Sequence, residues 1–287
     1  MTAITDTATD TAPPRPGDRW REGLRAAAVP EAVRGRSERT FSLEPDMFRW
    51  RPDQDAKQPP RPSRLRALEA LPEGGTVLDV GVGGGASSFG LASRAGLIIG
   101  VDRLEGMLES FEASAPTAGV AVRAVLGTWP EAVDDVDDVD VVVCHHALYG
   151  AEEIEDFLVA LTSRARHRVV VEVSSRGPTD ALNPLWKAIH GEQRQDRVVA
   201  DELEAVLAAM GLGATREDIV LPPTVREVTP QLVAFARRRL FVGEERDEEI
   251  AQLLRDLPPR EHRIAALWWP GAAQAGGGPG RGDAVPV

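Results

Sequence analysis

The sequence predicts an α/β fold built on a doubly wound, mostly parallel β-sheet. Short apolar segments rich in Val and Ile alternate with segments of helical pattern, as in repeated strand–helix units. The Val and Ile runs are nearly continuous, as in strands that are buried on both faces. A glycine-rich stretch, VLDVGVGGGA (77–86), lies where the first strand should turn into a helix.

Each element is expected from its local pattern. Strands are short apolar runs bounded by Gly or polar residues, and helices carry longer runs of helix-forming residues. Strands are expected over 76–81, 97–102, 120–125, 139–144, 168–174, 214–221 and 262–269. Helices are expected over 85–95, 104–114, 151–165, 180–191, 199–211, 229–241 and 247–257, and residues 18–35 form a helical segment interrupted by Pro30.

Four regions are expected along the chain. Residues 1–17 are rich in Thr, Ala, Asp and Pro and predict a disordered N-terminus. Residues 18–64 predict an N-terminal helical cap, residues 65–270 the main domain, and residues 271–287 a flexible Gly-rich tail.

Composition limits the class of protein. The chain has 287 residues, 43% of them apolar, and a net charge of −12. This negative charge argues against non-specific binding of nucleic acid. Its one cysteine, Cys144, excludes a disulfide within the chain and a cysteine-based zinc cluster. The N-terminus does not resemble a secretory signal, and no apolar run reaches the roughly 18 residues of a membrane span. We therefore expect a cytoplasmic protein with no membrane partner; its oligomeric state is left open.

The glycine-rich stretch is the expected ligand site. In a doubly wound sheet the ligand binds beyond the carboxyl ends of the strands, so the loop after the first strand is the place to look. Gly81, Gly83 and Gly85 let the backbone turn sharply and approach a ligand closely.

Two cofactor classes suit such a turn. Gly81-x-Gly83-x-x-Ala86, followed by Asp102, satisfies a loose dinucleotide fingerprint. Asp79 argues against that class, because its carboxylate would face the pyrophosphate. S-adenosylmethionine has no phosphate and carries two positive groups, so an acid at the end of the first strand favours it.

Two motifs carry a family resemblance. Asp79-x-Gly81-x-Gly83-x-Gly85 resembles motif I of the class I S-adenosylmethionine-dependent methyltransferases, and GVDRLEGML (100–108) resembles their second motif. The resemblance implies that Asp102 holds the ribose hydroxyls, with Arg103 beside it at the cofactor and Met107 near the adenine. It also implies a Rossmann-like seven-stranded sheet whose last strand is antiparallel.

The third motif departs from the family pattern. In LGTWPEA (126–132), Thr128 stands where the family often has an aspartate that binds the adenine amine. A hydroxyl can accept that bond more weakly. Trp129 either stacks on the adenine or packs in the core, and the sequence leaves both open.

The resemblance covers about residues 65–270. The helical stretch over 229–257 departs from the minimal fold and is expected as an insertion before the last strand. LNPLWKAIHG and FARRRLF are also similar to stretches in uncharacterised actinobacterial methyltransferases, which implies no particular substrate.

The end of the fourth strand is the expected reaction site, because the family places it beside the methyl group. His146 is the candidate catalytic base, His145 a candidate cofactor contact and Tyr149 a candidate substrate contact. Adjacent strand residues should point to opposite faces, so no metal site is expected from the two histidines.

Two further places suggest acceptor contacts. Trp186 and His190 are one helical turn apart on a helix that the family places over the acceptor pocket. Glu172 and Arg176 flank the end of the fifth strand, where they could bind a polar acceptor.

The sequence thus predicts an enzyme that uses S-adenosylmethionine to methylate an oxygen or nitrogen nucleophile of a small molecule. Two alternatives stay open. One is an NAD-dependent oxidoreductase, and the other is a catalytically degenerate regulatory protein that only binds S-adenosylmethionine.

Overall fold

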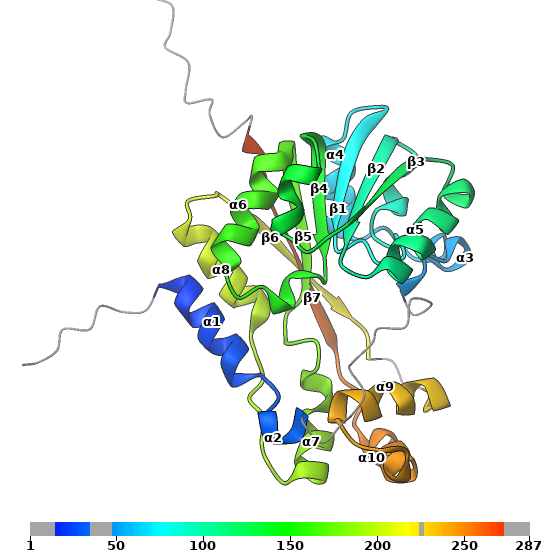
Figure 1. Ribbon diagram of the computed structural model, residues 1–287, viewed down its shortest axis with the longest axis vertical. Helices are drawn as coiled ribbons and strands as arrows, with labels where there is room; N and C mark the ends of the chain where they lie inside the picture. The colour runs from blue at the N-terminus through cyan, green and yellow to red at the C-terminus, as the bar shows by residue number, and fades with distance from the viewer. Residues whose placement is uncertain (1–14, 35–47, 224–226, 273–287) are drawn as a thin grey trace, which may run out of the picture.

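The structure, a computed structural model, describes residues 15–34, 48–223 and 227–272 (Figure 1). The predictions of a disordered N-terminus and of a Gly-rich tail fall almost wholly outside the described residues. Part of the predicted N-terminal cap, residues 35–47, also lies outside them.

All seven predicted strands are present in one sheet. Its order is β3-β2-β1-β4-β5-β7-β6, and only β7 runs antiparallel to its neighbours (Figure 1). The predicted Rossmann-like fold with an antiparallel last strand is therefore confirmed. The strands are β1 (Gly75–Val80), β2 (Ala95–Asp102), β3 (Ala121–Leu126), β4 (Val139–His145), β5 (Ala165–Ser174), β6 (Thr215–Leu221) and β7 (His262–Pro270).

Helices cover both faces of the sheet, which is why the central strands are apolar on both sides. On β5, Val169 and Val171 belong to the core that α6 and α8 cover, whereas Val170 belongs to the core on the opposite face, where α4 covers β5. The helices are α1 (Pro16–Ala26), α2 (Glu31–Arg34), α3 (Pro52–Asp55), α4 (Pro62–Ala70), α5 (Glu105–Ala118), α6 (Ile154–Arg164), α7 (Asn183–His190), α8 (Val199–Ala209), α9 (Pro230–Leu240) and α10 (Asp247–Asp256). Within the described ranges, no helix has the length and apolar character needed to span a bilayer.

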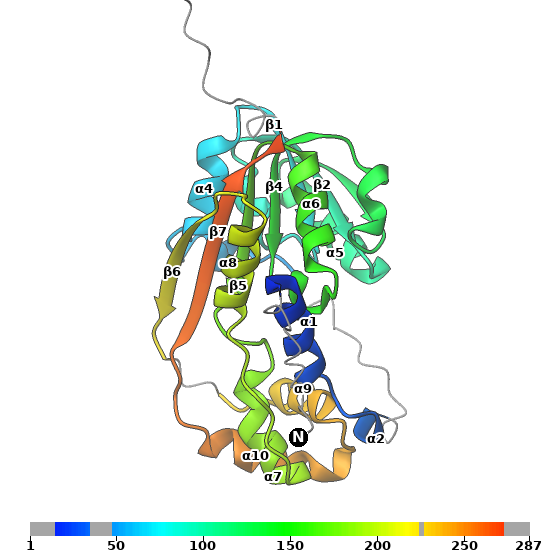
Figure 2. The ribbon, with the colours of Figure 1, turned by 90° about the vertical axis from the view of Figure 1, so that its left-hand side faces the viewer.

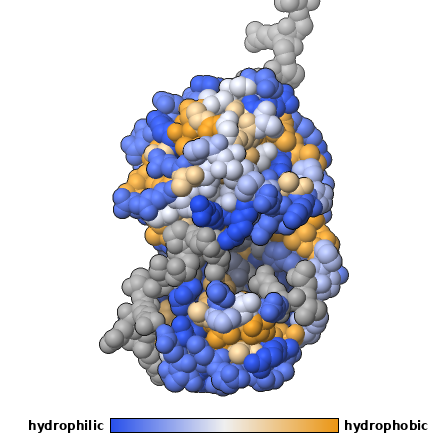
Figure 3. All heavy atoms as spheres, turned by 90° about the vertical axis from the view of Figure 1, so that its right-hand side faces the viewer, coloured by the Kyte–Doolittle hydropathy of each residue, from blue (hydrophilic) through white to orange (hydrophobic). Residues whose placement is uncertain are grey.

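A second, smaller core lies beyond the carboxyl ends of the parallel strands. Helices α2, α7, α9 and α10 form it around Trp186, Leu240 and Ile250, and we call these four helices the helical lobe (Figures 1 and 2). Helices α9 and α10 are the predicted insertion before β7. Figure 3 shows a hollow between the sheet domain and the helical lobe, with hydrophilic residues along its upper rim.

The helices of the predicted N-terminal cap go to separate places. Helix α1 packs against α6 and α8 and buries Trp20, whose Nε1 donates to Ala151 O over 2.7 Å, and α2 joins the helical lobe through Val33. Helix α4 spans the predicted boundary between residues 64 and 65 and buries Ala67 against the sheet.

The predicted helix over 85–95 is wrong. Residues 81–94 form turns with one short 3₁₀ segment, Phe89–Leu91. Gly85 has φ of 82°, which an α-helix does not accept, and Gly90 and two serines further lower the helical propensity. The segment is instead anchored by Phe89, whose ring contacts those of Trp50 and Phe111 with centroids 5.2 Å apart in each case.

Candidate functional site

The glycine turn follows β1 directly and has left-handed backbone at each of the three predicted glycines. The φ angles of Gly81, Gly83 and Gly85 are 76°, 52° and 82°. A Cβ on Gly81 would lie 2.2 Å from the Ala147 side chain, so this turn also packs closely on the loop after β4. The turn and the end of β4 are therefore held together as one site.

Asp79 is a buried carboxyl with no hydrogen-bond partner among the described residues. Neither of its oxygens is bonded, and the buried Ser88 hydroxyl is unpartnered as well. Burial raises the pKa of the Asp79 carboxyl to about 7; the nearby Ser88 hydroxyl opposes this rise, and the negative charge of Asp102 adds to it. A ligand with a positive group would stabilise the ionised Asp79 carboxylate, whereas a phosphate would destabilise it further.

Asp102 is fixed by backbone donors at the end of β2. Its Oδ2 accepts from Gly83 N over 3.0 Å, and its Oδ1 accepts from Leu104 N over 3.0 Å. The carboxylate is partly exposed, and each oxygen keeps a further acceptor site for a ligand hydroxyl. Of its predicted companions, Arg103 is exposed and Met107 is buried.

These residues fit S-adenosylmethionine better than a dinucleotide. A dinucleotide site uses the N–H groups and the dipole of a helix that begins at the glycine turn. Here no α-helix follows the turn, and the Gly83 N–H is already donated to Asp102. The unpartnered Asp79 carboxyl suits a cationic cofactor without phosphate.

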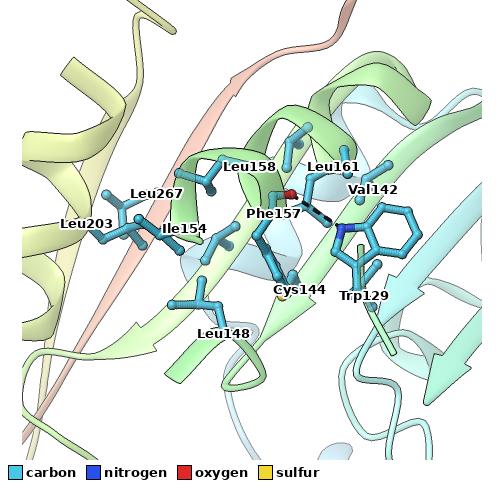
Figure 4. Close-up of a cluster of buried hydrophobic side chains, with 14 of the residues drawn as sticks. Trp129, Val142, Cys144, Leu148, Ile154, Phe157, Leu158, Leu161, Leu203 and Leu267 are labelled. Atoms are coloured by element: carbon cyan, nitrogen blue, oxygen red, sulfur yellow. Dashed lines mark hydrogen bonds between the residues drawn. The ribbon is translucent and has the colours of Figure 1, made fainter. Parts of the chain in front are cut away.

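Thr128 and Trp129, the third-motif residues predicted at the adenine, lie in different surroundings. Thr128 is exposed after β3, at the carboxyl edge of the sheet. Trp129 is 7% exposed and packs among Val142, Cys144 and Phe157, with its Nε1 donating to Phe157 O over 3.3 Å (Figure 4). The sequence left open whether Trp129 stacks on the adenine or packs in the core. In the structure its ring packs in the core.

His145, the last residue of β4, and His146, the first residue after it, line the same cavity, which corrects the expectation that they point to opposite faces. The reason is that the extended strand ends at His145: His146 has φ of 56°, an uncommon conformation for a residue other than glycine. The Nε2 atom of His145 is buried and has no partner in the described part of the chain. Burial lowers the pKa of His145 to about 4, so this ring is neutral near neutral pH.

Both ring nitrogens of His146 are hydrogen-bonded within the protein. Its Nδ1 lies 2.7 Å from Tyr149 Oη, and its Nε2 lies 3.2 Å from Glu172 Oε1. Tyr149 Oη accepts from Ser174 N over 2.7 Å, which leaves the phenol proton for Nδ1. The network thus assigns the imidazole proton to Nε2, which donates it to Glu172.

Glu172 is almost completely buried at the end of β5 and is held by three side chains. Arg61 Nη1 donates to Oε1 over 2.5 Å and Ser63 Oγ donates to Oε2 over 2.6 Å, in addition to the bond from His146. Burial opposes ionisation, but the hydrogen bond from His146 and the Arg61 charge lower the pKa of Glu172 well below its ordinary range. The carboxylate is therefore ionised beside the imidazole. The sequence suggested Glu172 only as an acceptor contact and missed Arg61 and Ser63, which no motif marks.

A cavity of about 340 Å³ lies against these groups. His145, His146 and Glu172 form one side, Ala86 and Ser87 of the glycine turn form another, and residues 49–64 form the rest. No group of three or more His, Cys, Asp or Glu side chains suited to a metal ion occurs among the described residues.

Three predicted acceptor contacts lie away from this cavity. Trp186 is buried in the helical lobe, and the His190 ring packs on it with centroids 4.2 Å apart. His190 Nε2 is also 2.8 Å from Leu240 O, so both rings have structural partners. Arg176 forms an ion pair of 2.5 Å with Asp196. Of the predicted acceptor residues, the structure brings Tyr149 and Glu172 to His146.

Comparison with known proteins gives one family match and several distant structural likenesses. Residues 77–167, from β1 into β5, match a family described as a methyltransferase domain. No curated protein sequence matches significantly.

Among solved structures, the chain is similar to three bacterial or archaeal proteins. The precorrin 8W decarboxylase of Methanobacterium thermoautotrophicum has 15% identity and a TM-score of 0.46, with 79% of this chain and 99% of that chain covered. The YcgJ protein from Bacillus subtilis has 16% identity and a TM-score of 0.48, with 73% and 97% covered. Magnesium protoporphyrin IX methyltransferase from Synechocystis PCC 6803, solved with bound SAH, has 17% identity and a TM-score of 0.46, with 88% and 93% covered.

Proposed function

We propose that the methyltransferase domain of this chain belongs to class I, uses S-adenosylmethionine and methylates an oxygen or nitrogen nucleophile of a small molecule in the cavity beside His146. A methyltransferase domain with this site fits S-adenosylmethionine, which would supply a methyl group on an electrophilic sulfonium when bound. The acceptor and the roles below are our proposal.

On the cofactor side, two carboxylates do the binding. Asp102, held by its two backbone donors, is oriented to accept from the ribose hydroxyls. Asp79 has no partner of its own, so it becomes ionised most readily when a positive group lies nearby. Thr128, exposed at the end of β3, remains available to the adenine amine. Arg103, Met107, Trp129 and His145 remain proposed as cofactor neighbours.

The observation that carries the reaction type is the contact between His146 and the buried Glu172. A carboxylate that accepts from Nε2–H fixes the imidazole tautomer and stabilises the imidazolium that forms when Nδ1 takes a proton. Tyr149 donates to Nδ1 at rest, and an acceptor hydroxyl or ammonium can take its place. His146 Nδ1 would then take the proton that the nucleophile loses on methylation.

This arrangement favours catalysis over binding alone. Burying an ionised carboxylate costs several kcal/mol unless good partners compensate, as a rough guide. Here Glu172 is hydrogen-bonded by Arg61, Ser63 and His146. This cluster lies next to the glycine turn proposed to hold the cofactor. A protein that only bound cofactor would not need this cluster.

The test compares two histidines of similar setting. His146 and His167 each have a 38% exposed side chain and an acidic neighbour, Glu172 at 3.2 Å and Asp140 at 3.5 Å, but His167 lies near the start of β5 at the opposite edge. Turnover is measured with a library of small acceptors, and S-adenosylhomocysteine affinity is measured by calorimetry.

We expect His146→Ala to lower turnover by about 10²–10⁴-fold, with cofactor affinity little changed, and to remove the acidic limb of the rate–pH profile. His167→Ala should leave both rate and affinity as in the wild type. If His146→Ala keeps its turnover and its acidic limb, His146 is not the base and alignment alone drives the transfer.

A further inference from the structure

The cavity beside His146 is strongly basic although the protein is acidic. Of the described residues that line it, four carry guanidinium groups and two, Asp55 and Glu172, carry carboxylates, so these six side chains sum to +2 in a chain of net charge −12. The four arginines come from one short segment: Arg49, Arg51, Arg61 and Arg64.

Two of these guanidinium groups are held in place by the cavity's own acids. Arg61 is bonded to Glu172, and Arg64 is bonded to Asp55. A guanidinium has five N–H donors, so one carboxylate partner orients the group and leaves donors for a ligand. The segment is anchored on the cofactor side as well, because Trp50 N donates to Gly84 O over 3.3 Å.

The four arginines line the same cavity as the groups of the proposed reaction. The same cavity is lined by Ala86 and Ser87 from the glycine turn and by His145 and His146 at the end of β4. A molecule bound to the arginines would therefore have its nucleophile within the space shared by the cofactor turn and the proposed base.

We infer that the methyl acceptor is an anionic small molecule whose carboxylate or phosphate group is bound by Arg49, Arg51, Arg61 and Arg64. Guanidinium groups pair with both kinds of anion in a planar, bidentate geometry. A cavity of about 340 Å³ suits a small molecule, and a net charge of −12 opposes a polyanion such as RNA. The role of this anion as the methyl acceptor rests on the proposed function, whereas the anion site itself does not.

The cofactor offers a rival use for these arginines, because S-adenosylmethionine also carries a carboxylate. The test therefore uses the full-length protein saturated with S-adenosylhomocysteine, so that any cofactor carboxylate is already bound. Calorimetry then measures the affinity for succinate, for inorganic phosphate and for the uncharged dimethyl succinate. A short RNA duplex forms a fourth arm.

We expect succinate or phosphate to bind and dimethyl succinate not to bind, and the stronger of the two anions identifies the group on the acceptor. Arg49→Gln should weaken that binding by about tenfold or more, as for loss of a charge-assisted contact. Arg94→Gln is the matched control, because Arg94 is an exposed arginine at the opposite edge of the sheet, just before β2.

Three results would overturn the inference. They are no anion binding to the saturated protein, anion binding that S-adenosylhomocysteine abolishes, and RNA binding that is tighter than that of either small anion. Methylation of neutral acceptors without anion binding would contradict this inference and leave the proposed function in place. Anion binding without any methyl transfer would contradict the proposed function and leave the anion site in place.

Discussion

Replacing the buried Asp79 with asparagine should change how the stability of the cofactor-free protein depends on pH. The carboxyl has an ordinary pKa of 3.8, which burial raises to about 7 in the folded protein. Between these values the folded state holds a proton that the unfolded state has lost, so the free energy of unfolding falls as pH rises. The fall is about 1.4 kcal/mol per pH unit and about 4 kcal/mol in all, of which about 2–3 kcal/mol lies between about pH 5 and about pH 8.

Asp79→Asn removes this titration and keeps the size of the side chain. Urea unfolding followed by circular dichroism at both pH values should therefore show a loss of stability toward high pH that is about 2–3 kcal/mol smaller than in the wild type. Asp137→Asn, at an 89% exposed side chain, is the control and should keep the wild-type slope. An equal slope in wild type and Asp79→Asn would refute the unpartnered buried carboxyl, and with it the argument for a cationic cofactor.

The remaining predictions concern three other positions of the site. Asp102→Ala should weaken S-adenosylhomocysteine binding, measured by calorimetry, by about 1.5–3 kcal/mol for each charge-assisted bond lost; unchanged affinity with an intact fold would contradict the ribose assignment. Gly83→Val should abolish that binding, because φ of 52° is strained for a β-branched residue, whereas Gly83→Ala, with its nearest contact at 3.5 Å, should be milder; normal binding by the valine variant would show that the turn does not hold the cofactor. Glu172 has a depressed pKa, so its stabilisation is present above the ordinary pKa of 4.5 and is lost as pH falls; thermal unfolding of Glu172→Gln should show a shallower loss in acid than the wild type, and an equal loss would count against the buried ion pair.

The sheet could be predicted because its signal is local. Each strand is a short apolar run ended by Gly or a polar residue, and burial on both faces makes these runs nearly continuous. Asp79 and Asp102 could be predicted for a similar reason, since each lies at or near a strand end and carboxyl ends of parallel strands meet at one edge.

The rest of the site depends on contacts that no local pattern contains. Arg61 and Ser63 reach Glu172 across more than a hundred residues of sequence, and nothing around them marks a binding role. The expected alternation of His145 and His146 failed because the strand ends between them, a boundary that periodicity does not resolve. The expected helix over 85–95 failed because backbone handedness at Gly85 and the packing of Phe89 outweighed its helical composition.

Arg61 connects the two proposed sites. It lines the basic cavity and also donates to the Glu172 oxygen that accepts from His146, at 2.5 Å and 3.2 Å respectively. An acceptor anion on Arg61 would share its positive charge, which leaves more of the negative charge of Glu172 to stabilise a protonated His146. Binding of an anionic acceptor would then strengthen the base that acts on it, and a neutral acceptor would lack this effect. We therefore interpret Glu172, His146 and the four arginines of the cavity as parts of one site.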